Sequence, residues 1–344
     1  MTMRLVDVAT CPLTGEGGAI KIASAIDAFF GTEGVWTYRE NARTGHLWLD
    51  PRPAQEHIGE LYRNYYTHAA STASSASIWQ QAVSVALARR LGYRLTITAG
   101  WAARFVSLLP TVGDAAEMEM MRIPAGESGT LLDVGCGSGG FLQRMRAVGW
   151  RVMGTEPDPK AAARLRDELG FPVFGSLDDI ETQQERFDVI TLSHVVEHLP
   201  DPLATLQQLS RLLASGGRMI LTTPNAKGLG ARLFGETWRG LEPPRHFNVF
   251  SRHSLAEAIA TAGLRVERVK TEVRLARGIF YLSVLAHRGQ TELECTHRPK
   301  SRTLKVAGYV FQLFASAAVH FFPDSGEEIY CSAVSDQRLE GDRS

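Results

Sequence analysis

Short apolar runs rich in β-branched residues alternate with amphipathic stretches between residues 131 and 270. The amphipathic stretches repeat their apolar positions at helical spacing, and the runs between them have the length of buried strands. This alternation predicts an α/β fold with a doubly wound, mostly parallel sheet. We expect strands at 130–134, 151–155, 172–174, 187–192, 218–223 and 264–271, and helices at 161–169, 202–213 and 254–262.

The regions flanking this core carry other patterns. Residues 78–109 are rich in Ala, Leu, Val and Arg and predict one or two helices, whereas residues 1–60 are mixed and punctuated by Gly and Pro. A late strand is expected at 327–334, after a helical insertion at 300–323. These patterns predict an N-terminal segment 1–70, a helical cap or linker 71–127, and a core 128–344 with a long loop at 224–250.

Residues 304–322 are strongly apolar, but their polar residues fall on one helical stripe. This arrangement predicts an amphipathic helix that does not span a membrane. Its other face must cover something, because each large apolar side chain left in water forgoes about 1.5–3 kcal/mol. The core or cap, a homodimer partner, a lipid-like substrate and a bilayer surface are the alternatives. That face holds Val306, Val310, Phe314, Ala318 and Phe321.

Composition narrows the class of partner. Hydrophobic residues make up 44% of the 344 residues, and 37 basic residues balance 37 acidic ones. This composition is typical of a soluble globular protein and argues against nucleic acid as a partner, since nucleic-acid-binding proteins usually carry a basic excess. The four cysteines form no CxxC pair, and the N-terminus has no secretory signal pattern, so we expect a cytoplasmic protein without disulfides.

The strongest motif is a glycine-rich turn after the first core strand, Leu131-Leu132-Asp133-Val134-Gly135-Cys136-Gly137-Ser138-Gly139-Gly140. Glycines allow a tight turn and let a ligand approach the backbone closely. The spacing of Gly135, Gly137 and Gly140 also fits the dinucleotide-binding pattern, so the turn alone leaves NAD open.

Two acidic residues favour S-adenosylmethionine (SAM) over NAD. Asp133 would repel a pyrophosphate but attract the cationic ammonium and sulfonium of SAM. Glu156 ends the next strand, where a carboxylate can accept hydrogen bonds from both ribose hydroxyls. Each residue also has a purely structural alternative. Asp133 could cap the turn by accepting hydrogen bonds from its backbone amides, and Glu156 could be an exposed acidic residue at the start of the next helix.

These motifs resemble the class I SAM-dependent methyltransferases, and within them the bacterial branch often called methyltransferase type 23 or 11. The resemblance covers roughly residues 128–270 and implies a Rossmann-like sheet of seven strands with an antiparallel last strand. It rests on the glycine turn, Glu156, Phe187-Asp188-Val189, Glu197-His198-x-x-Asp201-Pro202 and Gly216-Gly217-Arg218.

The resemblance also implies the residues that bind SAM. Ser176 stands where the family commonly has an acid, which makes adenine recognition at this position differ from the common pattern. The implied set is Asp133, Gly135, Gly137, Gly139 and Glu156 at the turn and ribose, Ser176 and Leu177 near adenine, and Ser193 and His194 near the methionine side.

The N-terminal segment resembles the small zinc ribbon that precedes this core in bacterial relatives. The resemblance rests on Cys11-Pro12-Leu13-Thr14-Gly15, residues 45–53 and residues 62–68. Of the four cysteines that hold zinc in such ribbons only Cys11 is present, so we expect the ribbon shape without a metal. His46 as a replacement ligand is the lesser alternative.

The loop 224–250 is the expected substrate region, because long loops at the carboxyl ends of strands usually bind or cover ligands. Trp238, Arg239 and Arg245 are its candidate substrate-binding residues, with packing and solvated charges as the plain alternative. Histidine suits a general base near neutral pH, which makes His246, His194 and His198 the candidates, in that order.

These features predict a SAM-dependent methyltransferase that acts on an oxygen of a sugar or small-metabolite hydroxyl. By analogy with the family, cell-envelope glycans and specialised metabolites are the expected acceptors. An inert SAM-binding scaffold and an NAD-dependent oxidoreductase are the alternatives.

Overall fold

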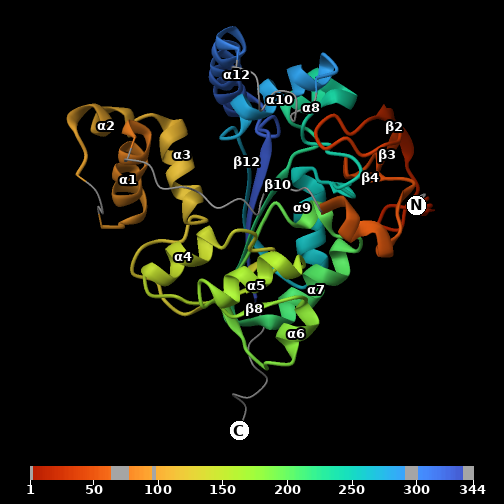
Figure 1. Cartoon of the computed structure of the whole chain (residues 1–344). Helices are drawn as coiled ribbons and strands as arrows, with labels where there is room; N and C mark the ends of the chain where they lie inside the picture. Colours follow the sequence, from red (N-terminus) through yellow and green to blue (C-terminus); the bar gives the residue numbers. More distant parts are fainter. Residues whose placement is uncertain (1–2, 63–76, 95–97, 291–300, 336–344) are drawn as a thin grey trace. The chain divides into compact units, whose positions relative to one another are not determined.

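Seven strands form one sheet in the computed structural model of the chain, which describes residues 3–62, 77–94, 98–290 and 301–335 (Figure 1). The strand order is β12-β13-β10-β9-β6-β7-β8. The bounds are β6 Thr130–Val134, β7 Arg151–Thr155, β8 Val173–Phe174, β9 Phe187–Ser193, β10 Leu213–Pro224, β12 Arg265–Glu272 and β13 Glu328–Val334.

The register of the sheet confirms the expected fold class. β6 pairs in parallel with β7, and β7 with β8. β13 is antiparallel to both β10 and β12. All five residues of β6 are buried, as expected for a strand covered on both faces. The late strand predicted at 327–334 is therefore the antiparallel strand of this sheet.

Local capping explains where several core helices begin. The Asp201 side chain accepts a hydrogen bond from Ala204 N, and Pro202 occupies the first turn, where its missing N–H costs nothing. Ser251 and Ser254 form a capping box at the next helix. The helices are α4 Gly140–Ala147, α5 Pro159–Asp167, α6 Leu177–Glu181, α7 Pro202–Leu212 and α9 Arg252–Thr261.

The chain divides into two compact units, Met1–Tyr65 with Leu192–Ser344, and Tyr66–Thr191. This division groups the N-terminal residues with the second half of the chain, whereas the boundaries expected from sequence separate them. The N-terminal residues group with the second half of the chain because both contribute strands to one four-stranded sheet. β2 (Ala19–Ala25), β3 (Trp36–Glu40) and β4 (Leu47–Leu49) pair in sequence, and β11 (Asn248–Val249) from the long loop adds the fourth strand.

Other contacts fasten the N-terminal segment. β1 (Leu5–Val6) pairs with β5 (Arg52–Pro53), and the 3-10 helix η1 (Gln55–Tyr62) follows. The Tyr38 hydroxyl donates to Leu241 O and lies 2.9 Å from His246 O. Two carbonyl oxygens of the loop after β10 therefore hold the Tyr38 hydroxyl in place.

In the second unit, three helices precede the sheet: α1 Ile78–Leu91, α2 Trp101–Val106 and α3 Pro110–Glu119 (Figure 1). α1 ends at Gly92, whose φ of 80° is the left-handed conformation that glycine adopts without strain. Small apolar residues such as Ala82, Ala86 and Ala116 form a buried cluster between these helices. The sequence pattern over 78–109 thus corresponds to two helices.

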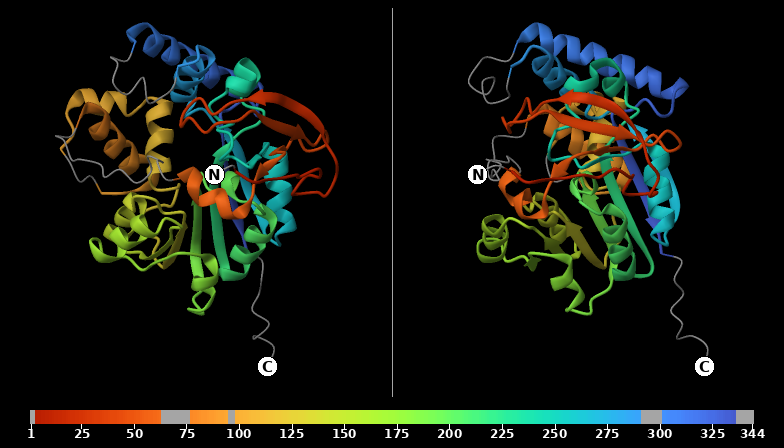
Figure 2. Two further views of the ribbon diagram at one scale, coloured as in Figure 1. Left: turned by 45° about the vertical axis from the view of Figure 1, so that its right-hand side comes forward. Right: turned by 90° about the vertical axis from the view of Figure 1, so that its right-hand side faces the viewer.

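In the first unit, α8 (Leu229–Phe234), the 3-10 helix η4 (Gly235–Thr237), α10 (Ala276–His287) and α12 (Arg302–Phe321) lie together, and α12 runs along α10 (Figure 2). By length and composition alone α12 is long and apolar enough to cross a membrane, whereas its sequence pattern predicts an amphipathic helix that does not span one.

α12 packs within the chain through a narrow stripe of its surface. Leu304, Gly308, Phe311 and Ala315 are buried, and Phe311 stacks on Phe280 of α10. A Cβ at Gly308 would lie 3.0 Å from Arg277 Cγ, so the glycine permits this close approach. The wide apolar face is exposed, with Val306 62%, Val310 61%, Phe314 62% and Phe321 79% accessible, which argues against the core as its cover but not against a partner, a lipid-like substrate or a bilayer.

Candidate cofactor and catalytic site

The glycine turn between β6 and α4 is shaped by positive backbone angles. Gly135, Gly137 and Gly139 have φ values of 67°, 54° and 77°, a conformation that residues with a Cβ rarely adopt. A Cβ at Gly139 would also lie 2.4 Å from Leu165 Cδ2 of α5. The turn therefore requires glycine for its own geometry and leaves no side chains on its three bends.

Glu156, after β7, supports the turn directly. Its Oε2 accepts a hydrogen bond from Gly137 N at 2.9 Å, and its Oε1 accepts one from Asp158 N at 3.0 Å. The side chain is only 7% exposed. Glu156 thus holds the glycine turn in place, a second task beyond the ribose contact expected from sequence.

Asp133 is a buried carboxylate at the end of β6. It is 5% exposed, and its Oδ1 accepts a hydrogen bond from the Thr191 hydroxyl at 2.7 Å. Burial raises the pKa of Asp133 to about 7, although the Thr191 bond opposes this shift. Sequence reasoning missed Thr191, because β9 reads there as an ordinary buried strand.

Ser176, expected near adenine, is the N-cap of α6. Its hydroxyl accepts from Asp179 N and donates to Asp179 Oδ2, which also accepts from Ser176 N. The spacing of Ser176 and Asp179 is a capping-box signal that could have been found in the sequence. Leu177 opens α6. The adenine contacts of both residues remain predictions.

At the end of β9, His194 lies between two carboxylates. Its Nδ1 is 3.2 Å from Glu197 Oε1 and its Nε2 is 2.7 Å from Glu328 Oε1. Burial alone would lower the pKa of His194, but these two hydrogen bonds outweigh burial and raise the pKa to about 10. The imidazole is therefore cationic near neutral pH and unable to accept a proton there.

Ser193, the other residue expected on the methionine side, has its Oγ 3.4 Å from Thr222 Oγ1.

His198 and His246 belong to a second set of polar side chains, which we name the glutamate–histidine cluster: Glu197, His198, Glu242 and His246. The two imidazole rings meet edge to face, with centroids 4.6 Å apart. His246 is 4% exposed, and its Nδ1 lies 2.8 Å from Gly240 O. Burial and the neighbouring His198 lower the pKa of His246 to about 4. Sequence reasoning missed Glu242, although it stands only four residues before His246 in the same loop.

The structure gives the three expected substrate-binding residues other partners. The Arg245 guanidinium is buried, donates to Asp27 Oδ2 at 2.9 Å and contacts the Phe30 ring. Trp238 is 2% exposed in an apolar cluster, and its Nε1 donates to Glu327. Arg239 pairs with Glu242. These contacts favour the packing alternative over an open anion clamp, because Trp238 and Arg245 are buried and Arg239 is paired with Glu242.

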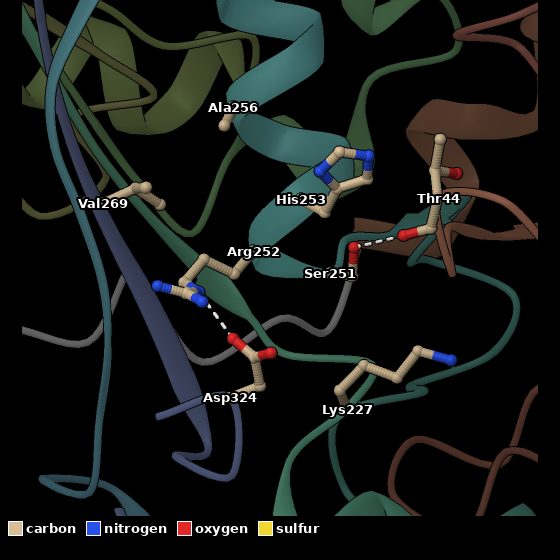
Figure 3. Close-up of a pocket in the computed structure, with 8 residues that line it drawn as sticks. All are labelled: Thr44, Lys227, Ser251, Arg252, His253, Ala256, Val269 and Asp324. Atoms are coloured by element: carbon tan, nitrogen blue, oxygen red, sulfur yellow. Dashed lines mark hydrogen bonds and ion pairs between the residues drawn. The ribbon is translucent and has the colours of Figure 1, made fainter. Parts of the chain in front are cut away.

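A cavity of about 270 Å³ lies beside the start of α9 (Figure 3). Arg252 on its wall pairs with Asp324, and Ser251 Oγ donates to Thr44 O. Lys227 Nζ lies 2.6 Å from Glu40 Oε1. No site residue expected from sequence lines this cavity, so it adds no support to the cofactor or acceptor assignment.

Cys11 and His46, the remnants of the expected ribbon site, are both buried. His46 Nε2 lies 3.2 Å from Asn248 Oδ1, and its ring packs on Phe250. Within the described residues, the group with metal-ligating geometry contains neither Cys11 nor His46. The contacts of His46 with Asn248 and Phe250 therefore favour a structural role for this histidine over metal binding.

Comparisons with known proteins agree with the methyltransferase fold and function that the glycine turn predicts. Residues 114–269 match the family model of a methyltransferase domain. The ubiquinone biosynthesis O-methyltransferase of Proteus mirabilis is 35% identical over 102 residues, which cover 28% of this chain and 42% of the relative. Its namesake in Xanthomonas axonopodis pv. citri is 31% identical over 159 residues, covering 42% and 66%. The chain spans about half the length of the curated relatives it matches.

Among solved structures, the chain is similar to a SAM-dependent methyltransferase from Archaeoglobus fulgidus, with a TM-score of 0.42, 18% identity, and coverage of 64% of this chain and 92% of that one. The match of residues 114–269 decides between the SAM and NAD interpretations of the turn. Residues 114–269 therefore form a methyltransferase domain whose cofactor is SAM.

Proposed function

We propose that the chain transfers the methyl group of SAM to an oxygen of a small-molecule acceptor, a sugar or small-metabolite hydroxyl. The observation that carries the choice of oxygen is the similarity to relatives named ubiquinone biosynthesis O-methyltransferase. Sugar acceptors enter from the resemblance to bacterial relatives that modify sugars, which is an analogy at the level of the family.

The turn between β6 and α4 fits SAM on physical grounds. A carboxylate as deeply buried as Asp133 is stabilised in its ionised form by a nearby cation, and SAM carries both an ammonium and a sulfonium. Within the described residues, the side-chain hydrogen bond that Asp133 accepts comes from the neutral Thr191 hydroxyl and not from a cation. Gly135 and Gly137 present backbone to a ligand without a Cβ.

Methyl transfer from a sulfonium needs alignment of sulfur, methyl and acceptor, together with removal of a proton from a weakly acidic hydroxyl. His194 is held by Glu197 and Glu328, which makes it a positioning residue for the end of β9. The neutral imidazole of His246 remains our candidate base, with His198 as its neighbour. His198 is the more exposed of the two rings.

We also propose that the exposed face of α12 contacts an anionic lipid surface. Residues 274–290 and 301–322 contain no acidic residue, whereas they include Arg277, Arg302 and Lys305. A basic helix pair with a wide exposed apolar face suits attachment to the surface of anionic membranes. Such attachment would give the enzyme access to lipid-like acceptors.

Turnover separates an enzyme from an inert SAM-binding protein. Purified full-length chain is incubated with SAM and a panel of nucleotide sugars, phenols and catechols, and S-adenosylhomocysteine is quantified. We expect acceptor-dependent product with at least one hydroxyl compound, and none with the O-methylated analogue of that compound. SAM binding without turnover on any acceptor would favour the scaffold alternative.

A further inference from the structure

The glutamate–histidine cluster brings together side chains from two places in the chain. Glu197 and His198 lie in the 3-10 helix η3 (Val196–His198), whereas Glu242 and His246 lie in the loop between α8 and β11. One ligand atom each of Glu197, His198 and His246 lies within 4.8 Å of the other two. Glu242 Oε2 is 3.8 Å from His246 Nε2. All four residues belong to the same compact unit.

We propose that this cluster binds one divalent transition-metal ion, of the Zn²⁺ or Mn²⁺ class, with Glu197, His198 and His246 as its ligands and Glu242 as a neighbouring carboxylate.

The donor set fits such an ion. Imidazole nitrogens and carboxylate oxygens bind Zn²⁺ at about 2.0–2.2 Å, and mixed sets of two histidines with carboxylates are typical of sites that keep a position open. Ligand atoms around one ion lie roughly 3 Å apart at these bond lengths. The separations among Glu197, His198 and His246 exceed this by less than about 2 Å, which side-chain rotation can close.

An unpaired oxygen provides a second, independent observation. Glu242 is 2% exposed, and its Oε1 has no hydrogen-bond partner within the described residues. A buried acceptor left unsatisfied costs about 1–3 kcal/mol, and more when it is charged. Glu242 also has a φ of 36°, a strained value for a residue with a side chain. A cation bound beside Glu242, or a water on that cation, would give this oxygen a partner.

Outer contacts orient the proposed ligands in the way that metal sites require. His246 Nδ1 donates to Gly240 O at 2.8 Å, which leaves the lone pair of the neutral ring on Nε2, the atom nearer Glu242. His198 Nδ1 lies 2.9 Å from the Tyr62 hydroxyl and 3.1 Å from Arg245 O. Glu197 Oε2 accepts from the Thr223 hydroxyl at 2.9 Å.

The proposal departs from the expectation of no metal, which considered the cysteines of the N-terminal segment. In one respect it rests on the proposed function: an ion held by three protein ligands keeps a position where the acceptor hydroxyl could bind and become more acidic, and His246 would then act as a ligand instead of the base. Metal binding itself does not depend on that role, so it can be measured without any acceptor.

The experiment uses the full chain, stripped with a chelator and titrated with Zn²⁺ and with Co²⁺ as a spectroscopic substitute. We expect about one equivalent of Zn²⁺ in calorimetry, and visible Co²⁺ bands without the intense near-ultraviolet band of a thiolate ligand. Glu242→Gln and His198→Gln should each weaken binding at least tenfold. His253→Gln, which removes a surface histidine outside the cluster, should leave binding unchanged.

Absence of a stoichiometric Zn²⁺ or Co²⁺ complex in the parent chain would overturn the proposal. A thiolate charge-transfer band would overturn it too, because it would move the ion to a cysteine. Wild-type spectra keep the test valid if a cluster variant fails to fold. Methyl transfer by the metal-free protein would support the proposed function and exclude a catalytic role for the ion. Metal binding without turnover would support the metal site and contradict the proposed function.

Discussion

Arg245 Nη1 lies 2.9 Å from Asp27 Oδ2, and this buried ion pair joins residues 218 positions apart in the chain. The two side chains are 2% and 0% exposed. The pair anchors the N-terminal segment to the loop that carries Glu242 and His246. This pair explains why Arg245, a candidate for substrate binding from its sequence position, has a buried guanidinium.

Removal of one partner of this pair should destabilise the protein strongly. Asp27→Asn leaves the Arg245 charge buried and uncompensated, so we expect a loss of about 3–5 kcal/mol in the free energy of unfolding, measured in urea. The matched control is Glu257→Gln, which breaks the exposed pair of Arg43 and Glu257 and should cost about 0–1 kcal/mol. Equal effects of the two substitutions would contradict the anchoring role.

SAM binding should depend on the glycine turn and on Glu156. Gly137→Val places a β-branched residue at a φ of 54°, and Glu156→Ala removes the acceptor of Gly137 N. Each change should weaken SAM binding by roughly tenfold to several hundredfold in calorimetry. Gly289→Val, at another positive φ but far along the sequence, is a control for backbone strain alone. Parental SAM affinity in both test variants would refute the cofactor assignment.

The affinity for SAM should rise with pH between 5.5 and 7.5. Burial raises the pKa of Asp133 to about 7, so the carboxyl is mostly protonated at pH 5.5 in the free protein and mostly ionised above pH 7. A cationic ligand binds the ionised form, and affinity should therefore fall by up to about tenfold per pH unit below 7. Calorimetry in buffers of different ionisation enthalpy should show proton release at pH 6. Asp133→Asn should bind weakly at every pH, and a steep pH dependence that survives in this variant would point to another group.

Sequence patterns located the strands well, because each strand is a contiguous local signal. The predicted ranges 130–134 and 151–155 coincide with β6 and β7, whose apolar runs are short, and β6 is flanked by Gly129 and Gly135. The role of Arg245 could not be predicted in this way, because no local pattern indicates a partner as distant as Asp27. The same holds for Glu328, which reaches His194 through the antiparallel strand β13.

The face of α12 shows a different limit. Helical periodicity identified an amphipathic helix, but it did not say which stripe packs. Gly308 has no side chain and lets α10 approach, so the narrow stripe of Gly308 and Phe311 is buried and the wider apolar face is not. Periodicity measures hydrophobicity, whereas packing also depends on how closely two backbones can approach.

The exposed face of α12 should bind anionic vesicles. We expect co-sedimentation with phosphatidylglycerol vesicles, little with phosphatidylcholine, and a loss of at least fivefold in bound fraction for Phe314→Asp. Val35→Asp introduces the same charge at a 67% exposed apolar residue outside α12 and is the matched control. Light scattering would detect the alternative, a homodimer through this face, as a mass that falls to that of the monomer in Phe314→Asp.

Replacement of His246 should impair catalysis more than cofactor binding. His246 is held by Gly240 O and packs on the His198 ring, so its imidazole is oriented within the glutamate–histidine cluster. A general base contributes about 10²–10⁴-fold, so His246→Gln should lower kcat by that factor while the dissociation constant for SAM changes only a few fold. Calorimetry with SAM and a turnover assay on the acceptor found in the panel give the two quantities, and thermal unfolding confirms that the variant is folded. The control is His253→Gln, which should keep the parental kcat. Near-parental kcat in His246→Gln would assign proton removal to another group, whereas a loss that millimolar Zn²⁺ or Mn²⁺ reverses would show that the histidine acts as a metal ligand and not as the base.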